Sequence, residues 1–172
     1  IRAIHDNREL IDEDFRINEQ HNDLFMQFLR NNLRISSTLK RMMRYGILGR
    51  YIPDFGSIIG HMQYDLFHIY TVDEHSLRMV QMLRRYRHAD EKEHFPVAHN
   101  LVKKIKRKEV LYITAILHDA GKMHRGEHEI AGAEIAKEFC KQHKLNQYDA
   151  DMVEWLVRNH LVMSQASQRI DI

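Results

Sequence analysis

The sequence contains little of what would indicate strands, disulfides or a membrane segment. Gly and Pro are scarce, at 7 and 2 of 172 residues, and no stretch alternates apolar and polar residues long enough to predict a strand. The single cysteine, Cys140, has no partner for an intrachain disulfide, which fits a reducing compartment. We therefore expect an all-α fold.

Long apolar runs and signal-peptide features are also missing. The longest apolar run, Val110 to Leu117, is too short to cross a bilayer, and the first ten residues contain no apolar core of a signal peptide. We expect a cytoplasmic protein with no membrane partner. Because the chain begins with Ile1 rather than Met, we also expect it to be a fragment of a longer protein.

The charge is nearly balanced. A formal net charge of +2, with 13 His taken as neutral, gives no broad basic surface for nucleic acid, so no nucleic-acid partner is expected. The one basic run, Lys103 to Lys108, is interpreted as a solvated helix end, where cations are favourable next to the negative end of the helix dipole.

Length and composition suit one globular domain that buries its own core. The chain is 44% hydrophobic and 29% charged over 172 residues. We expect an N-terminal helical segment over residues 1–35 and the principal domain over residues 36–172.

Apolar spacing and capping residues predict the helices of the principal domain. Ser36 and Ser37 are expected to cap a short helix that ends at Gly46, and Pro53 and Gly56 are expected to lie in a connector. Pro96 is expected in the first turn of a helix, a position that tolerates proline. The other predicted helices run from Thr71 or Asp73 to Arg87, from Glu109 to Asp119, from Glu127 to His143 and from Gln147 to His160.

The most informative stretch is AILHDAGKMHRGEHEIAGAE, in which an apolar helix runs into His118-Asp119. Burying even a neutral polar group costs roughly 2–7 kcal/mol unless something compensates, and a divalent metal would do so directly. Gly121 can end the helix and direct Lys122 into the same space, where its ammonium would attract phosphate. A purely structural His–Asp hydrogen bond is the alternative explanation.

Further candidate ligands lie at other predicted helix ends or first turns. They are His75, His128 and His160, with Asp171 eleven residues beyond the last of them. Imidazole nitrogen and carboxylate oxygen suit Zn, Fe and Mn, whereas Mg prefers the carboxylate. His124 and His128 have the spacing of a helical metal pair, but Gly126 between them indicates a loop. Most of the remaining histidines are expected to be surface or core residues.

The motif MQYDLFHIYTVDEHSL, over residues 62–77, together with His118-Asp119 and the late motifs NHLVMS and QRIDI, resembles the HD-domain superfamily of metal-dependent phosphohydrolases. The resemblance implies an HD-type helical bundle in which one set of residues binds a first metal, namely His75, His118, Asp119 and Asp171. It also implies that His128 and His160, with Asp119 bridging, hold a second metal in two-metal members. Lys122 matches the lysine that contacts phosphate.

Within that superfamily, the resemblance is closest to the central domain of the bifunctional uridylyltransferase/uridylyl-removing enzymes, and it covers roughly Ser36 to the end. It implies a phosphodiesterase that hydrolyses UMP from a tyrosine of the PII nitrogen regulatory protein. Mn or Mg is the expected cofactor, with Fe and Zn as alternatives, and one or two ions bind per site. The parent protein would carry flanking nucleotidyltransferase and sensory domains.

The loop after Lys122 departs from that family. Met123-His124-Arg125-Gly126-Glu127 stands where a Gly-Arg-Gly-Gly-Asp type of loop is usual, so the contact with substrate phosphate is expected to come from Arg125. Glu129 stands where a small hydroxyl residue is usual.

Three other functions remain open from the sequence. The first is an HD hydrolase of free nucleotides such as guanosine tetraphosphate or dNTPs. The second is a non-catalytic module that binds metal or nucleotide to regulate its neighbours, and the third is a purely structural helical scaffold.

Overall fold

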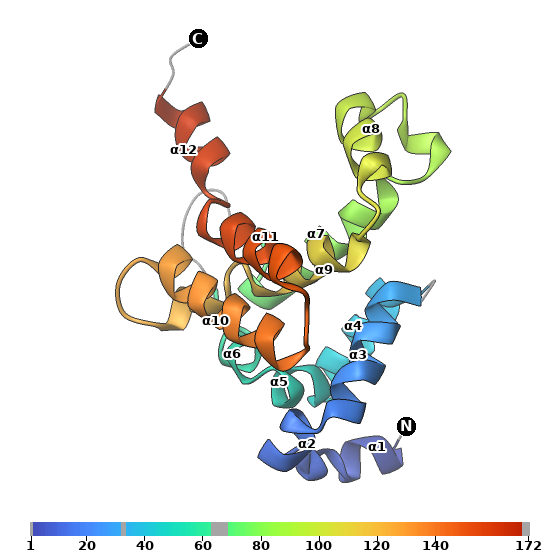
Figure 1. The fold of residues 1–172 in the computed structure, drawn as a ribbon, viewed down its shortest axis with the longest axis vertical. Helices are drawn as coiled ribbons and strands as arrows, with labels where there is room; N and C mark the ends of the chain where they lie inside the picture. The colour runs from blue at the N-terminus through green and yellow to red at the C-terminus, as the bar shows by residue number, and fades with distance from the viewer. Residues whose placement is uncertain (1, 32–33, 63–68, 170–172) are drawn as a thin grey trace.

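The computed structural model describes residues 2–31, 34–62 and 69–169, and these residues form helices and no strand (Figure 1). The prediction of an all-α fold is therefore confirmed. The elements of the first part are α1 (Arg2–Asp6), η1 (Arg8–Leu10), α2 (Glu13–Ile17), α3 (Glu19–Asn31), α4 (Ile35–Arg44), α5 (Ile47–Tyr51) and α6 (Pro53–Ser57).

The second part contains the two longest described helices, α7 and α10. Its elements are α7 (Val72–Arg85), η2 (Ala89–Glu91), α8 (Pro96–Lys104), α9 (Lys108–Leu117), η3 (Ala120–Met123), α10 (His128–Gln142), α11 (Gln147–Arg158) and α12 (Val162–Arg169). Among the described residues, no helix combines the length and the apolar character that a membrane crossing requires.

Helix α9 lies in the interior. Figure 1 shows it crossing the middle of the molecule, with α10 and α11 to one side and α3 and α4 to the other. It packs against α7, α11, α3 and α10, and Val110, Ile113 and Leu117 are almost completely buried. A helix that is apolar on every side is stable only when other elements surround it. The C-terminal end of α9 is therefore held deep in the fold.

Two glycines bring η3 against α10. A Cβ added to Gly121 would lie 2.2 Å from the His128 carbonyl oxygen and 2.5 Å from the Gly132 nitrogen. These backbones approach so closely that only glycine fits at position 121. The turn after α9 is thereby fixed next to the first turn of α10.

Tyr51 links the N-terminal helices to the end of α10. Its hydroxyl lies 2.9 Å from Asn22 Oδ1 on α3 and 2.8 Å from Nε2 of His143, the residue that follows α10. The other ring nitrogen of His143, Nδ1, lies 2.8 Å from the Phe139 carbonyl and donates to it. This buried network connects segments that are far apart in the sequence.

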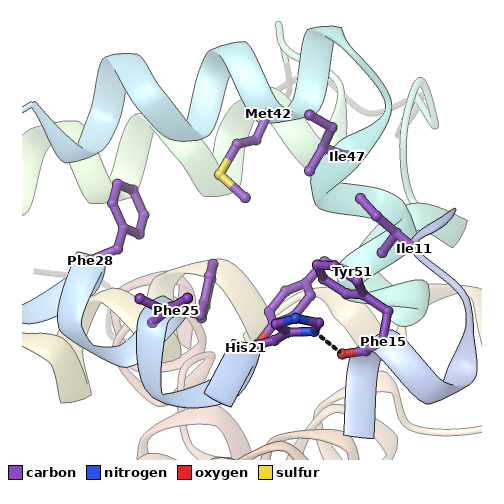
Figure 2. A pocket seen from close by; sticks show the side chains of 9 residues that line it. Ile11, Phe15, His21, Phe25, Phe28, Met42, Ile47 and Tyr51 are labelled. Atoms are coloured by element: carbon purple, nitrogen blue, oxygen red, sulfur yellow. Dashed lines mark hydrogen bonds between the residues drawn. The ribbon is translucent and has the colours of Figure 1, made fainter. Parts of the chain in front are cut away.

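An apolar pocket of about 250 Å³ opens among α2, α3, α4 and α5 (Figure 2). Phe15, Phe25, Phe28 and Met42 are among the side chains that surround it, and the His21 ring donates through Nδ1 to the Phe15 carbonyl at 2.9 Å. None of its lining residues is a predicted site residue.

Two local predictions for the first half were wrong. The helix expected to be capped by Ser36 and Ser37 begins at Ile35, and Ser37 donates instead to the Arg34 carbonyl at 2.9 Å. The expected connector at Pro53 and Gly56 is the short helix α6, with Pro53 at its first position. In both cases a residue typical of helix ends lies within the first turns of a helix, where it is also tolerated.

Candidate metal centre

Asp119 lies at the centre of the candidate site, and its two carboxylate oxygens face different partners. Oδ2 is 3.3 Å from His118 Nε2 and 2.8 Å from Lys122 Nζ. Oδ1 is 3.5 Å from His160 Nε2 and 3.9 Å from His128 Nε2. Only 2% of the Asp119 surface is exposed. A single buried carboxylate therefore connects two groups of side chains.

The end of α9 positions the dyad. Leu117 is the last residue of α9, and the His118 N–H still donates to the Thr114 carbonyl. His118 Nδ1 lies 3.0 Å from the Ala115 carbonyl, to which it donates, so Nε2 is the nitrogen that faces Asp119. A hydrogen bond of this kind orients a histidine and fixes its tautomer, as it does around metal ligands.

His75 completes the first group. It lies in the first turn of α7, which packs against α9, and its ring centroid is 5.3 Å from that of His118. One ligand atom each from His75, His118 and Asp119 lies within 4.8 Å of the others. This is the spacing of a possible metal site built from two separate helices.

The second group contains Asp119, His128 and His160, whose ligand atoms also lie within 4.8 Å of one another. His160 follows α11, and its Nδ1 donates to the Val157 carbonyl at 2.6 Å. His128 is the first residue of α10, and its Nδ1 lies 3.5 Å from Glu129 Oε2. In both histidines the Nε2 atom is the one nearer Asp119.

The atoms of the second group fit a cation. The Nε2 atoms of His128 and His160 are both buried, and neither has a hydrogen-bond partner among the described residues. Leaving a buried polar atom unpaired costs about 1–3 kcal/mol, and a cation placed between these nitrogens and Asp119 would remove that cost. Imidazole nitrogens and a carboxylate oxygen are also the donor types that Zn, Fe and Mn accept.

The charges around Asp119 favour its ionised form. Burial alone raises the pKa of this carboxyl group, but contacts with His118, His160 and Lys122 outweigh burial and hold the pKa well below its ordinary value. Burial lowers the pKa of His128, although the Asp119 and Glu129 carboxylates partly offset it. For His160 burial also acts to lower the pKa, but Asp119 and the Val157 carbonyl raise it overall.

The remaining predicted site residues differ in their placement. Lys122, in η3, contacts Asp119 directly, as expected for a cation pointing into the same space. Arg125 is exposed in the loop before α10, and its contact with substrate phosphate stays a prediction. Asp171 lies outside the described residues.

The carbonyls of Ala115 and Val157, which orient two of the histidines, were not identified from the sequence. No side-chain pattern marks them, because any residue supplies a carbonyl. The loop placement of His124, by contrast, was predicted from Gly126 and is confirmed, since α10 begins only at His128.

Two family models match different parts of the chain. The HD domain model matches residues 72–171, which contain both groups of side chains around Asp119. The chain belongs to the HD domain family. The model of the uridylyltransferase GlnD third domain matches residues 1–51. The division of the chain at residue 35 stays a prediction.

Bifunctional uridylyltransferase/uridylyl-removing enzymes are among its relatives. The chain is 45% identical over its full 172 residues to the enzyme of Pseudomonas fluorescens strain SBW25. It is 44% identical to the enzymes of Pseudomonas putida strain W619 and Pseudomonas aeruginosa strain UCBPP-PA14 over the same length. The chain spans 19% of the length of these relatives. Family and relatives together support a metal-dependent phosphohydrolase.

Proposed function

We propose that the chain is a metal-dependent phosphodiesterase that removes UMP from a tyrosine of the uridylylated PII nitrogen regulatory protein. The observation that carries the proposal is the position of Asp119, whose two oxygens each face a separate group of imidazoles. The names of the relatives supply the uridylyl-removing activity, and flanking nucleotidyltransferase and sensory domains belong to the same proposal for the parent protein.

The first group would hold one divalent ion, preferably Mn or Mg, through His75, His118 and Asp119, with Asp171 as a further proposed ligand. The second group would hold another through His128, His160 and the second oxygen of Asp119. The chemistry that such ions supply is a decrease in the pKa of a water molecule from 15.7 to about 7–9, together with polarisation of a phosphoryl oxygen.

The side chains provide the rest of the proposed reaction. Because contacts with His118, His160 and Lys122 favour its ionised form, the Asp119 carboxylate would serve as an anionic metal ligand and not as a proton donor to the leaving group. Lys122 presents its ammonium beside Asp119, where it can attract the phosphate of the substrate. The leaving tyrosine has a pKa of about 10, so its departure requires no strong general acid. Arg125, exposed in the loop before α10, is the proposed source of an additional contact with the phosphate.

The test is release of UMP from uridylylated PII protein in the presence of Mn²⁺ or Mg²⁺. We expect His118→Ala and Asp119→Ala to lose turnover by at least about 10³-fold, because each removes a ligand on which the reaction depends. The matched control is His124→Ala, since His124 is exposed and belongs to neither group. It should keep the wild-type rate and fold.

Free nucleotides provide the competing substrates. Guanosine tetraphosphate and dNTPs should be hydrolysed much more slowly than uridylylated PII. The proposal is wrong if a free nucleotide is the better substrate, or if His118→Ala and Asp119→Ala release UMP as fast as the wild type. Tight metal binding without turnover of any phosphodiester would favour a regulatory module instead.

A further inference from the structure

A second pocket adjoins the candidate metal centre along α7. It has a volume of about 530 Å³, within the range of about 300–1,000 Å³ that is typical of small-molecule sites. His75 belongs both to this α7 pocket and to the first group of candidate ligands. Most of its lining residues belong to α7, and Tyr70 precedes that helix.

The floor of the α7 pocket follows one face of the helix. His75, Met79, Met82 and Tyr86 are separated by four, three and four residues, which places them in a single row. With a rise of 1.5 Å per residue, the row extends roughly 16 Å from His75 to Tyr86. Most of the surface beyond His75 is therefore thioether and aromatic ring, which favours flat, weakly polar groups.

The arginines on the rim already have carboxylate partners. Arg78 Nε lies 3.2 Å from Glu74 Oε1, and its guanidinium carbon lies 3.8 Å from the centre of the Tyr70 ring. Arg85 is paired with Glu91. Arg78, close to His75, shares Glu74 with Lys40. In the far part of the pocket Arg85 is balanced by Glu91, so this part offers little net attraction to a second phosphate. The charged end of a ligand is favoured only near His75 and Asp119.

We propose that the α7 pocket holds the uridine of the uridylyl group. This inference rests on the proposed function, since it assigns a place to one of the two substituents of the phosphodiester. With the phosphate beside His75, the ribose and uracil would extend over Met79 and Met82 along α7. Uracil is uncharged, has flat faces, and carries donors and acceptors at its edge, which the Gln81 amide on the rim can match.

A peptide strand of the partner protein fits this pocket less well. An extended peptide needs partners for its own N–H and C=O groups, and recognition of such strands usually relies on a sheet edge. Between Met79 and Arg85 the backbone N–H groups of α7 are used within the helix, and the Arg84 and Arg85 carbonyls accept from the residues that follow it. The pocket therefore suits a nucleoside, whose polar groups are few and lie at its edge.

The direct test is binding of UMP and of inorganic phosphate to the Mn²⁺-loaded protein by calorimetry. Met82→Glu should weaken the binding of UMP by about tenfold or more relative to the binding of inorganic phosphate, because it places a charge on the apolar floor of the pocket. Arg78→Ala, which removes an exposed side chain stacked on Tyr70, should act in the same direction without opening the core. Met152→Glu, on α11 and outside the pocket, is the matched control and should leave the ratio as in the wild type.

Kinetics separate the two proposals. The substrates are bis(p-nitrophenyl) phosphate, the p-nitrophenyl ester of UMP, and uridylylated PII. Met82→Glu should lower kcat/KM for both uridine substrates relative to bis(p-nitrophenyl) phosphate by about tenfold. A loss confined to uridylylated PII would show that the pocket docks peptide, and an equal loss on all three would show a general effect; either overturns the inference.

The binding measurement remains decisive if catalysis fails. If the wild type binds UMP, Met82→Glu weakens this binding, and none of the three substrates is cleaved, the inference stands and the proposed function is wrong. If the wild type cleaves uridylylated PII, but Met82→Glu and Arg78→Ala bind UMP as tightly as the wild type, the proposed function stands and the inference is wrong.

Discussion

At the scale of single residues, His143 shows how burial makes a side chain sensitive to pH. Its ring is buried against Phe139 and Phe25, with Nδ1 donating to the Phe139 carbonyl and Nε2 next to the Tyr51 hydroxyl. Burial lowers the pKa of His143 from 6.5 to about 4, although the Phe139 carbonyl opposes this shift. The folded protein therefore keeps this ring neutral at pH 7.

This shift predicts a loss of stability in mild acid. The unfolded chain, with a His143 pKa near 6.5, binds the proton more tightly than the folded chain does, so stability is full above pH 6.5 and decreases until about pH 4. Between pH 7 and pH 5 the contribution of this residue should fall by about 2 kcal/mol. Urea unfolding of the wild type and of His143→Gln at both pH values separates the contribution of His143 to the free energy of unfolding from that of the other histidines. Equal pH dependence of the two proteins would contradict the account.

The sequence identified the central residues because of their setting. His118 and Asp119 were conspicuous since a polar pair ended the most apolar helix, and the structure places both in the buried centre. Their surroundings could not be predicted in the same way. Which oxygen of Asp119 faces which imidazole depends on the turn between α9 and η3, and that turn is set by backbone contacts with α10. Asp171 stays a prediction.

At the scale of elements, the contact between η3 and α10 decides whether the second group can form. Gly121 allows the His128 carbonyl and the Gly132 nitrogen to approach its α-carbon. His128 is part of that approaching backbone, and Lys122 follows Gly121 directly. The same close packing therefore holds both side chains beside Asp119.

Gly121→Ala should separate η3 from α10. Its methyl group would lie 2.2 Å from the His128 oxygen, and because the obstacles are backbone atoms, we expect a destabilisation of about 3 kcal/mol or more, measured by urea unfolding. Gly126→Ala is the control within the same segment: no atom lies within 4 Å of its added methyl, and only its φ of 101° is unfavourable, at about 1–3 kcal/mol. A Gly121→Ala protein as stable as the wild type would show that the contact is not needed.

Long helices were more predictable than short ones. The predicted helices over Glu127–His143 and Gln147–His160 agree closely with α10 and α11, because their apolar residues recur at spacings of three and four. Pro96 correctly marked the first residue of α8. The helices α5 and α6 have five residues each, too few for a periodic pattern, and they exist because Leu48 and Phe55 are buried by the rest of the core.

At the scale of the whole molecule, the candidate centre joins parts of the chain that are distant in sequence. His75 comes from α7, His118 and Asp119 from the end of α9, His128 from α10, and His160 from the end of α11. These helices pack around α9, which explains how their ends meet at one point. The apolar pocket of the N-terminal helices contains none of these residues (Figure 2).

The central claim is that Asp119 and the surrounding imidazoles bind divalent metal. The most direct measurement is an anomalous-scattering map from crystals of the protein grown with excess Mn²⁺. The account predicts a peak bonded to Asp119 together with His75 and His118, and a second ion, where present, between the other Asp119 oxygen and His128 and His160. A map without any peak at Asp119, in crystals that bind Mn²⁺ only elsewhere or not at all, would contradict it.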